Sequence, residues 1–365
     1  MRHNKGTTLK DVAEEAGVHI MAAAVVLNGS RSTARVSDAT RARILEAALR
    51  LCYTPRADLP GRCETAMGSI GILLEKSEWN LHSHEMLNGV LDCAAENFQS
   101  VCIFLVRTWN LDTEPHILEF CRGRGRKLIC IAPDFGHTEL PLACRSVPTV
   151  MIQSAMPVRG VHNIACDDEG GSYEAVRYLI SLGHRRIAYF PGELHLAASR
   201  HRLDGYRRAL AVAGIPGDES LVHAPGWGTY KSGRDRMLAL LERWEALPTA
   251  IACGNDAIAS GCMDVLAQQG ISVPEHVSVV GYGDALTAQL TNPPLTTVRQ
   301  PLQRMGEMAI HRLCNSSLRN QAVRPISSES AGGGSCIKDN REVFKADLIL
   351  RNSVGPPHTT SSRLD

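Results

Sequence analysis

The sequence predicts an all-α head at the N-terminus, followed by a larger α/β core with parallel sheets in two lobes. In residues 8–51, two short helical patterns meet at Gly17 and a third follows, which is the outline of a helix-turn-helix. From residue 69 onward, short β-branched runs alternate with helical stretches, as in parallel sheets covered by helices. The 365 residues also exceed the length of one small domain.

The helices of the head carry recognisable start and stop signals. Thr8 is expected to cap the first helix, and Gly17 supplies the turn that follows it. The second helix is expected from about residue 19 to residue 27, ending at Asn28 and the glycine after it. Ser37 is expected to cap the third helix. Such a small unit usually serves to hold one helix in the major groove of DNA.

The composition is that of an ordinary soluble globular protein. Hydrophobic residues make up 44% and charged residues 21% of the chain, and the net charge is +1. Residues 1–65 hold ten Lys or Arg against seven Asp or Glu, a small basic excess that suits contact with phosphates. No stretch is long and apolar enough to span a membrane, and the N-terminus has no apolar segment of a signal peptide.

The cysteines and the missing motifs narrow the possible functions further. Twelve cysteines are scattered without a C-x-x-C pair, so we expect free thiols in a reducing cytoplasm rather than disulfides or a zinc site. No metal-binding histidine pattern, nucleophile elbow, P-loop or dinucleotide fingerprint occurs in the right context. We therefore expect no cofactor, no metal and no enzymatic activity. The basic run at residues 122–127 is interpreted as a surface loop before a strand, and the alternative is an arginine-rich patch that binds nucleic acid.

The head resembles a known DNA-binding domain. The segments TLKDVAEEAGV, VLNGS and VSDATRARILEAA, with Tyr53, Thr54 and Pro55 after them, are similar to the N-terminal domain of the LacI/GalR family of bacterial transcription regulators. The resemblance covers residues 7–62 and implies binding to double-stranded operator DNA. The alternative reading of the same pattern is a small three-helix bundle without DNA-binding function.

The second helix departs from the family pattern, S-x-x-T-V-S-R. Ala22, Ala24 and Val25 stand where family members place phosphate-binding and base-reading side chains, and they can donate no hydrogen bond. Ile20 and Met21 fall at base-reading positions and can offer only apolar contact, for example to a thymine methyl group. The candidates for DNA contact are Thr8, Lys10, His19, Ile20, Met21, Asn28, Arg31, Arg35, Ser37, Thr40, Arg41 and Arg62.

The linker after the head also departs from the family pattern. Family members have a short hinge helix here, whose leucine enters the minor groove. In this chain Leu59, Pro60 and Gly61 occupy the hinge, and Arg62 stands where the leucine belongs. Because proline inside a short helix costs roughly 3 kcal/mol, we expect an irregular hinge that bends DNA little or places Arg62 in the groove.

The core is expected to contain seven strands and helices between them. The strands are expected at residues 70–74, 101–106, 128–131, 149–152, 187–190, 250–253 and 277–280, with helical patterns at 171–182, 199–213 and 256–269. The segments CDDEGGSYEAVRYLISLGHRRIAYFPG, ASRHRLDGYRRAL and PTAIACGNDAIASG resemble the periplasmic-binding-protein-like core of the same family. This resemblance covers residues 66–357 and implies two lobes joined by three crossovers, which close on a small effector and form a homodimer. The polar residues 316–340 are read as a flexible insertion.

The resemblance also implies an effector site that this chain only partly matches. The residues at matching positions are Asn80, His82, Asp167, Arg202, Asn255, Asp256 and Asp284. Gly283 replaces the aspartate that often holds sugar hydroxyls, and His82 lies where an aromatic side chain is usual. We therefore expect an effector that is sugar-like or more polar and anionic, read by Arg202 and His82, unless the histidine is merely exposed at the start of a helix.

These patterns predict a cytoplasmic, dimeric transcription regulator, a repressor like most of the family, whose operator affinity a small molecule controls. The mechanism that the resemblance implies is linkage between effector binding and the placement of the two heads. The alternative is a cytoplasmic small-molecule binding protein with a weakened or vestigial DNA-binding head. The effector, the operator and the direction of regulation are not encoded in any motif of the sequence.

Overall fold

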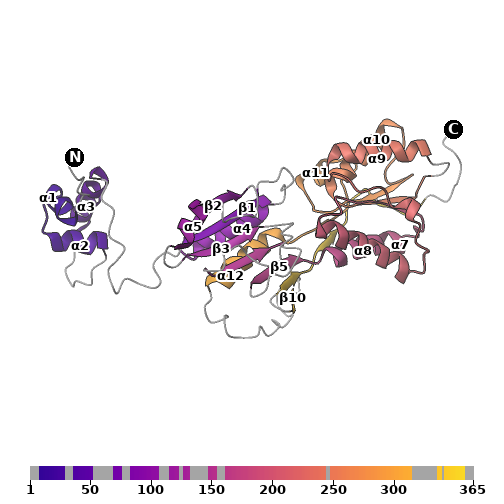
Figure 1. Cartoon of the computed structure of the whole chain (residues 1–365). Helices are drawn as coiled ribbons and strands as arrows, with labels where there is room; N and C mark the ends of the chain where they lie inside the picture. The colour runs from indigo at the N-terminus through magenta and orange to yellow at the C-terminus, as the bar shows by residue number, and fades with distance from the viewer. Residues whose placement is uncertain are drawn as a thin grey trace. The chain divides into compact units, whose positions relative to one another are not determined.

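The structure of the chain is a computed structural model, and it divides into two compact units, Met1–Ala66 and Met67–Asp365. It describes residues 8–28, 36–51, 69–75, 83–106, 115–122, 126–131, 147–153, 161–243, 247–314, 335–338 and 341–357. Figure 1 shows the elements of both units along the chain.

The first unit contains three helices in its described residues, α1 (Leu9–Glu15), α2 (Ile20–Asn28) and α3 (Asp38–Arg50). Thr8 caps α1 in a reciprocal capping box with Asp11. Gly17 adopts a φ of 61° in the turn between α1 and α2, as the sequence predicts. The small core consists of Val12, Ala13, Ala16, Ala23, Ile44, Ala47 and Ala48. Leu51, just after α3, packs at the edge of this core.

The first lobe of the second unit is built on a seven-stranded sheet in the order β10-β11-β5-β4-β3-β1-β2. Its strands are β1 (Ser69–Glu75), β2 (Ser100–Val106), β3 (Lys127–Ile131), β4 (Thr149–Ile152), β5 (His162–Cys166), β10 (Ser335–Lys338) and β11 (Arg341–Phe344). Neighbouring strands among β1, β2, β3, β4 and β5 pair in parallel, and so do β5 and β11. Strand β10 pairs antiparallel with β11. The prediction of a flexible insertion at residues 316–340 is therefore wrong for residues 335–338. These residues form an edge strand, because the backbone of β11 can hydrogen-bond to them.

Helices cover both faces of this sheet, because successive side chains of a strand point to opposite faces. The helices are α4 (Ser83–Glu96), α5 (Pro115–Arg122) and α12 (Leu302–Cys314). Alternate strand residues such as Ile70 and Ile129 pack with α4 and α12, whereas Leu73 and Leu128 pack with α5. A Cβ atom on Gly89 of α4 would lie only 2.0 Å from the carbonyl oxygen of Gln303, so glycine allows α4 and α12 to pack closely.

The second lobe has the same layered plan around the parallel sheet β6-β7-β8. Its elements are α7 (Asp168–Ser181), β6 (Ile187–Phe190), α8 (Ala197–Val212), η2 (Glu219–Leu221), α9 (Tyr230–Arg243), β7 (Ala250–Cys253), α10 (Asp256–Gln268), β8 (Ser278–Val280) and α11 (Leu286–Leu290). Tyr189 and Ala250 face α7 and α8, whereas Phe190 and Ile251 face α9 and α10. The lobe is thus a three-layer sandwich with a buried sheet (Figure 1).

The chain passes between the lobes three times, which agrees with the expected crossovers. It crosses after β5 into α7, after β9 (Thr297–Arg299) into α12, and after β11 into β12 (Asp347–Ile349). The crossing segments are bonded to one another: the Asp167 amide donates to the Phe344 carbonyl at 2.8 Å, and the Gln300 side chain donates to Asp168 at 3.3 Å. Strands β9 and β12 pair antiparallel.

The last described residues return to the sheet of the second lobe. The Val279 amide donates to the Ser353 carbonyl at 2.8 Å, and the Ser353 hydroxyl donates to the Val279 carbonyl at 2.6 Å. The Gly355 carbonyl accepts a hydrogen bond of 2.8 Å from Nε2 of His184. Burial lowers the pKa of His184 below its usual value, so the imidazole is suited to remain neutral in this contact.

Candidate functional site

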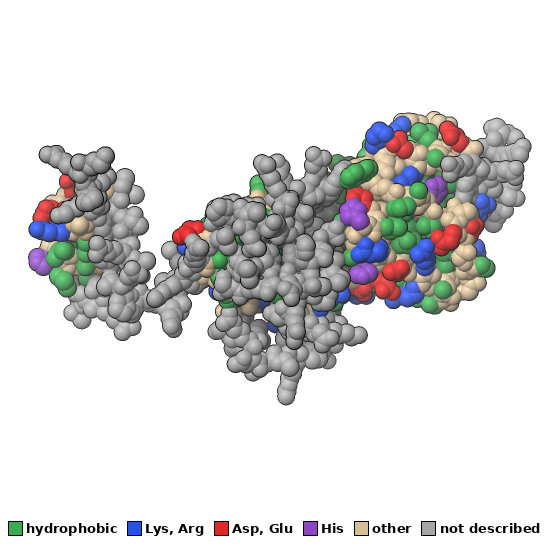
Figure 2. Space-filling model, viewed as in Figure 1, with side chains coloured by type: hydrophobic (Ala, Val, Ile, Leu, Met, Phe, Trp, Pro, Cys, Tyr) green, Lys and Arg blue, Asp and Glu red, His purple; other side chains and the backbone are tan. Residues whose placement is uncertain are grey.

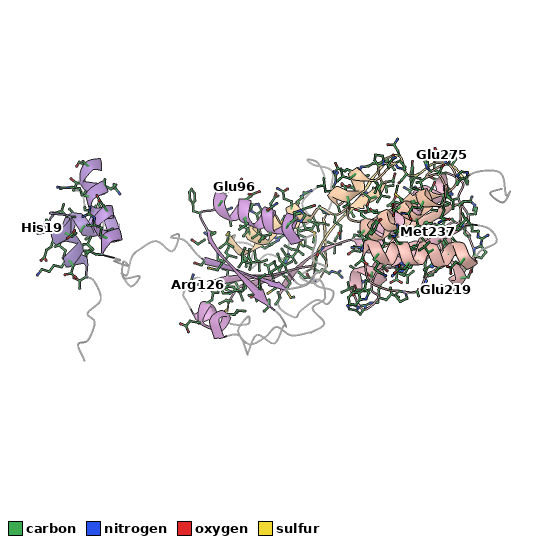
Figure 3. All side chains as sticks on the ribbon, turned by 90° about the horizontal axis from the view of Figure 1, so that it is seen from above. His19, Glu96, Arg126, Glu219, Met237 and Glu275 are labelled. Atoms are coloured by element: carbon green, nitrogen blue, oxygen red, sulfur yellow. The ribbon has the colours of Figure 1, made fainter. Side chains whose placement is uncertain are left out.

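The exposed start of α2 is the first candidate contact surface of the head. Ile20 and Met21 are 40% and 55% exposed, although both are large and apolar. His19 precedes them, and its Nδ1 atom accepts a hydrogen bond of 3.3 Å from the Met21 amide. Figure 3 shows His19 at the edge of the head. The first turn of α2 therefore presents two apolar side chains that are held by a capped backbone.

The remainder of α2 turns towards the helices of the head. Ala23 is fully buried in the core, and Ala22 packs at its edge. Ala24 and Val25 are half-buried. None of these side chains carries a donor, so the exposed part of α2 has only His19 as a polar group near its start.

The hydroxyl groups predicted to contact DNA are engaged in helix caps. The backbone amide and the hydroxyl of Thr8 both donate to the Asp11 carboxylate at 2.7 Å, and these two hydrogen bonds lower the pKa of Asp11. The Ser37 and Thr40 hydroxyls lie 2.9 Å apart at the start of α3, and the Thr40 amide donates to Ser37. The expected caps at Thr8 and Ser37 are confirmed.

The charged candidates in the head have few fixed contacts. Lys10 is exposed and lies 3.7 Å from Glu14, and an exposed pair of this kind contributes little to stability. Arg41 is exposed on α3. Asn28 is the last residue of α2, and only its backbone is described. The predicted contacts Arg31, Arg35 and Arg62 lie outside the described residues.

The strand order of the second lobe creates a topological switch point between β6 and β7. After β6 the chain runs through α8 to Val222, which bridges Tyr189 on one side of β6. It then returns through α9 to β7, which pairs with the other side of β6. In open α/β sheets, ligands bind at the carboxyl ends of the strands at such a point. The residues that follow β6 and β7, starting at Pro191 and Gly254, are therefore the second candidate site.

Arg202 reaches this point from α8 and is fully engaged there. Its guanidinium contacts Asp168 Oδ1 through Nε and NH2, at 2.8 Å each, and NH1 donates to the Gly254 carbonyl at 2.8 Å. The guanidinium also lies 3.8 Å from the centre of the Tyr282 ring. Asp168 thus neutralises the arginine that the sequence predicts to read an anionic effector.

Asp167 and Asn255 stand at the same end of the lobe as helix caps. Asp167 accepts a hydrogen bond of 2.8 Å from the Gly170 amide at the start of α7. Asn255 accepts one of 2.8 Å from the Ile258 amide at the start of α10, while its Nδ2 atom donates to the Gly228 carbonyl at 2.8 Å. Both side chains are half-buried, so each combines a structural bond with some accessible surface.

The other two predicted aspartates have internal partners. Asp256 is buried and accepts hydrogen bonds from the Thr297 hydroxyl at 2.5 Å and the Ala285 amide at 2.7 Å. Burial outweighs these bonds and raises its pKa to about 6. Asp284 is buried between Arg299 at 2.5 Å and Arg351 at 2.6 Å. These contacts favour a structural role for both residues.

The structure adds two residues that the sequence reading passed over. Trp227 lies before α9 and is 59% exposed, next to Gly228, which binds Asn255. Arg236 of α9 donates to the carbonyl of Pro191, the first residue after β6. Trp227 stands between Gly226 and Gly228, and this pattern is the sequence signal for it. Arg236 follows no motif, because its neighbour Pro191 lies 45 residues away.

The first-lobe candidates Asn80 and His82 lie outside the described residues, and His84 is exposed at the start of α4. Within the described ranges no cluster of His, Cys, Asp or Glu is arranged to hold a metal ion. The eight cysteines of those ranges are free thiols, six of them buried. Among the described helices, none has the length and apolar character of a membrane span.

Comparison with known proteins matches both units. Residues 8–56 match the family described as bacterial regulatory proteins of the lacI family, and residues 176–328 match the periplasmic binding protein-like domain. The transcriptional repressor PurR of Vibrio atlanticus (strain LGP32) is 32% identical over 313 residues, covering 84% of this chain and 90% of PurR. The ribose operon repressor of Escherichia coli (strain K12) is 33% identical over 336 residues, covering 88% and 98%.

A solved structure extends this likeness to the whole chain. The lac repressor dimer, bound to operator and the anti-inducer ONPF, superposes with a TM-score of 0.71 at 25% sequence identity. The match covers 96% of this chain and 100% of that one. Both the helical head and the two-lobed core therefore have counterparts in one protein.

Proposed function

This chain belongs to the LacI family of bacterial regulatory proteins, and from that premise we propose that it is a repressor whose head binds a two-half-site operator under the control of a core effector. A DNA-binding transcription regulator needs a reader and a sensor, and the chain has a helix-turn-helix unit and a ligand-binding-type core. The observation that carries the proposal is the exposed first turn of α2, where Ile20 and Met21 lie open to a partner. Its relatives are transcription regulators, and we propose a cytoplasmic protein without enzymatic activity.

In the proposed DNA complex the start of α2 enters the major groove. Ile20 and Met21 contact the C5 methyl groups of thymine, because apolar side chains can read that group but cannot accept or donate a hydrogen bond. Lys10, Arg41 and the basic residues Arg31 and Arg35 bind phosphates, which supply affinity rather than sequence specificity. The reader is thus built from apolar base contacts and electrostatic anchoring.

The effector in this proposal binds at the carboxyl ends of β6 and β7 in the second lobe. Asn255, Asp167 and Trp227 offer hydrogen-bonding groups and an indole face, a combination suited to a small polar ligand with an apolar ring face. Asn80 and His82 are proposed to line the ligand from the first lobe. An effector that favours one arrangement of the lobes changes operator affinity by its difference in affinity for the two states.

We further propose that the core forms a homodimer, as the family resemblance implies. Exposed apolar side chains support this: Ile103 and Leu105 lie on the edge strand β2, and Leu286 and Leu290 lie on α11. Exposed apolar side chains that gather in one place mark interaction surfaces. Figure 2 shows hydrophobic side chains at the surface of the second lobe.

Binding of the purified full chain to its own upstream DNA tests the reader. A gel shift whose affinity falls steeply as salt rises is expected, because phosphate contacts release counterions. The replacements Ala22, Ala24 and Val25 favour the second candidate, a solute binder with a weakened head. Absence of any shift, with and without cell-extract metabolites, would support that candidate.

Sedimentation of the full chain tests the dimer. The wild-type protein is expected to sediment as a dimer at micromolar concentration, and a charge at the edge strand, Ile103→Glu, is expected to shift it towards the monomer. Val212→Glu, at another exposed apolar position outside β2 and α11, is the matched control and should leave the dimer intact. A wild-type monomer at that concentration contradicts the proposal.

A further inference from the structure

Arg236 is a half-buried cation without a negative partner among the described residues. It lies on α9 between the buried residues Gly233 and Met237. NH1 donates to the Pro191 carbonyl, whereas NH2 is buried and has no hydrogen-bond partner in the described part of the chain. Burial lowers the pKa of the guanidinium. No ion pair to a described carboxylate accompanies it.

Three other half-buried arginines of this core each contact a carboxylate. Arg202 pairs with Asp168, Arg312 with Glu342, and Arg351 with Asp284. An uncompensated buried charge is costly, and proteins normally pair it or neutralise it. Arginine retains its proton even when its pKa is lowered, because the ordinary value lies above 12. The charge of Arg236 is therefore present and unbalanced by its described surroundings.

The position of this charge coincides with the switch point. Pro191 is the first residue after β6, and the loop before α9 lies over the guanidinium: a Cβ atom on Gly226 would stand 2.7 Å from NH2. The next residue of that loop is Trp227, and Gly228 accepts the hydrogen bond of Asn255. The loop that carries the exposed indole thus meets the unpaired nitrogen through a glycine, Gly226.

We propose that Arg236, rather than Arg202, recognises the charge of the effector, and that the effector is a small molecule bearing a phosphate or carboxylate group. The anionic group pairs with NH2 of Arg236 when the loop around Gly226 gives way, and the rest of the ligand lies against Trp227. Arg202 is not available for this role, because Asp168 already neutralises it. A fork of N–H donors matches both phosphate and carboxylate oxygens. This inference rests on the proposed effector site of the second lobe.

The test compares probes that differ in charge. The melting temperature of the full chain is measured with inorganic phosphate, D-ribose 5-phosphate, D-gluconate and D-ribose, against sodium chloride of equal ionic strength. At least one anionic probe is expected to raise the melting temperature and to bind about tenfold more tightly than ribose. A preference for ribose 5-phosphate assigns the group as phosphate, and a preference for gluconate assigns it as carboxylate.

The variants locate the effect. Arg236→Gln is expected to abolish the advantage of the anion, and Arg236→Lys, which keeps the charge but loses the fork, to reduce it. Arg234→Gln is the matched control on the same helix, because Arg234 contacts Asp264 and Gln268 instead, and it should retain the full effect. Circular dichroism checks that each variant folds.

Two results overturn the inference: no anion stabilises the wild-type chain, or Arg236→Gln and Arg236→Lys both respond as the wild type does. Gel shifts of the same variants separate this outcome from failure of the proposed function. The head is a separate unit, so an intact shift in all variants, without an anion effect, rejects only the role of Arg236. Absence of a shift in every protein, including the wild type, instead rejects DNA binding.

Discussion

The two proposed contact sites of this chain use opposite chemistry. The start of α2 exposes apolar side chains, Ile20 and Met21, whereas the switch point of the second lobe holds the buried charges of Asp168 and Arg202. Exposed apolar side chains have little effect on the stability of the free protein, and in the complex they discriminate only modestly between DNA sequences. Buried charges must be balanced within the protein at all times. Substitutions of the contact residues in the head should therefore change stability little, whereas substitutions of the buried charges in the second lobe should destabilise it.

The largest effect expected from this difference is the loss of Asp168. Asp168→Asn leaves Arg202 without its counter-charge, and removing one partner of a buried ion pair costs roughly 3–5 kcal/mol. Urea denaturation measures this cost. Ile20→Ala in the head serves as the comparison, and its free energy of unfolding should stay within about 0.5 kcal/mol of the wild type. Equal, small effects of both substitutions would remove the contrast between the regions.

A second, smaller effect concerns pH, where the two regions should respond in opposite directions. Burial raises the pKa of Asp256 from 3.8 to about 6, so its contribution to stability is present below pH 3.8 and is lost as the pH rises to about 6. Hydrogen bonds to Thr8 lower the pKa of Asp11, so its contribution is present above pH 3.8 and is lost as the pH falls.

Asp256→Asn tests this assignment. The stability difference between wild type and variant should change between pH 4 and pH 6, by at most about 3 kcal/mol, and stay constant above that range. Chemical denaturation at several pH values measures it, and Asp11→Asn is the counterpart in the head, with the opposite slope. A difference that does not vary with pH would show that Asp256 is not titrating in this range.

The smallest expected effect lies at the DNA-facing end of α2. Met21→Ala should weaken binding to selected DNA by about 1 kcal/mol, because it removes contact with a methyl group. Replacing the contacted thymine by uracil should weaken wild-type binding by a similar amount and have no further effect on the variant. Fluorescence anisotropy measures both. If uracil weakens both proteins equally, Met21 does not contact that methyl group.

Much of the fold could be predicted from the sequence, because its signals are local. The strands at 149–152, 187–190 and 250–253 coincide with β4, β6 and β7, since each is a short apolar run with turn residues beside it. The apolar pattern does not predict strand β5, because His162 and Asn163 interrupt it. The sequence does not predict strand β10, because its segment is polar and glycine-rich. This strand forms by hydrogen bonding to β11 at the edge of the sheet.

The candidate site was harder to predict, because its decisive contacts join distant parts of the chain. The sequence predicts Arg202 as a site residue, but its partner Asp168 lies 34 residues away, and no spacing rule links the two. The unpaired nitrogen of Arg236 is a property of packing, which a sequence pattern does not contain. Local rules thus located the helix caps at Thr8 and Ser37, and they left the charge balance of the site unknown.

The three crossovers have a consequence for the order in which the protein can be made. The first lobe needs β11, and the sheet of the second lobe is joined by Ser353 and Gly355 near the end of the chain. A ribosome makes these residues after the other strands and helices of the two lobes, so neither lobe can complete its contacts until they emerge. The head, which is a separate unit, has its three described helices within residues 9–50. It can fold while the ribosome is still translating the core, which places a DNA-reading unit in the cell before its sensor exists.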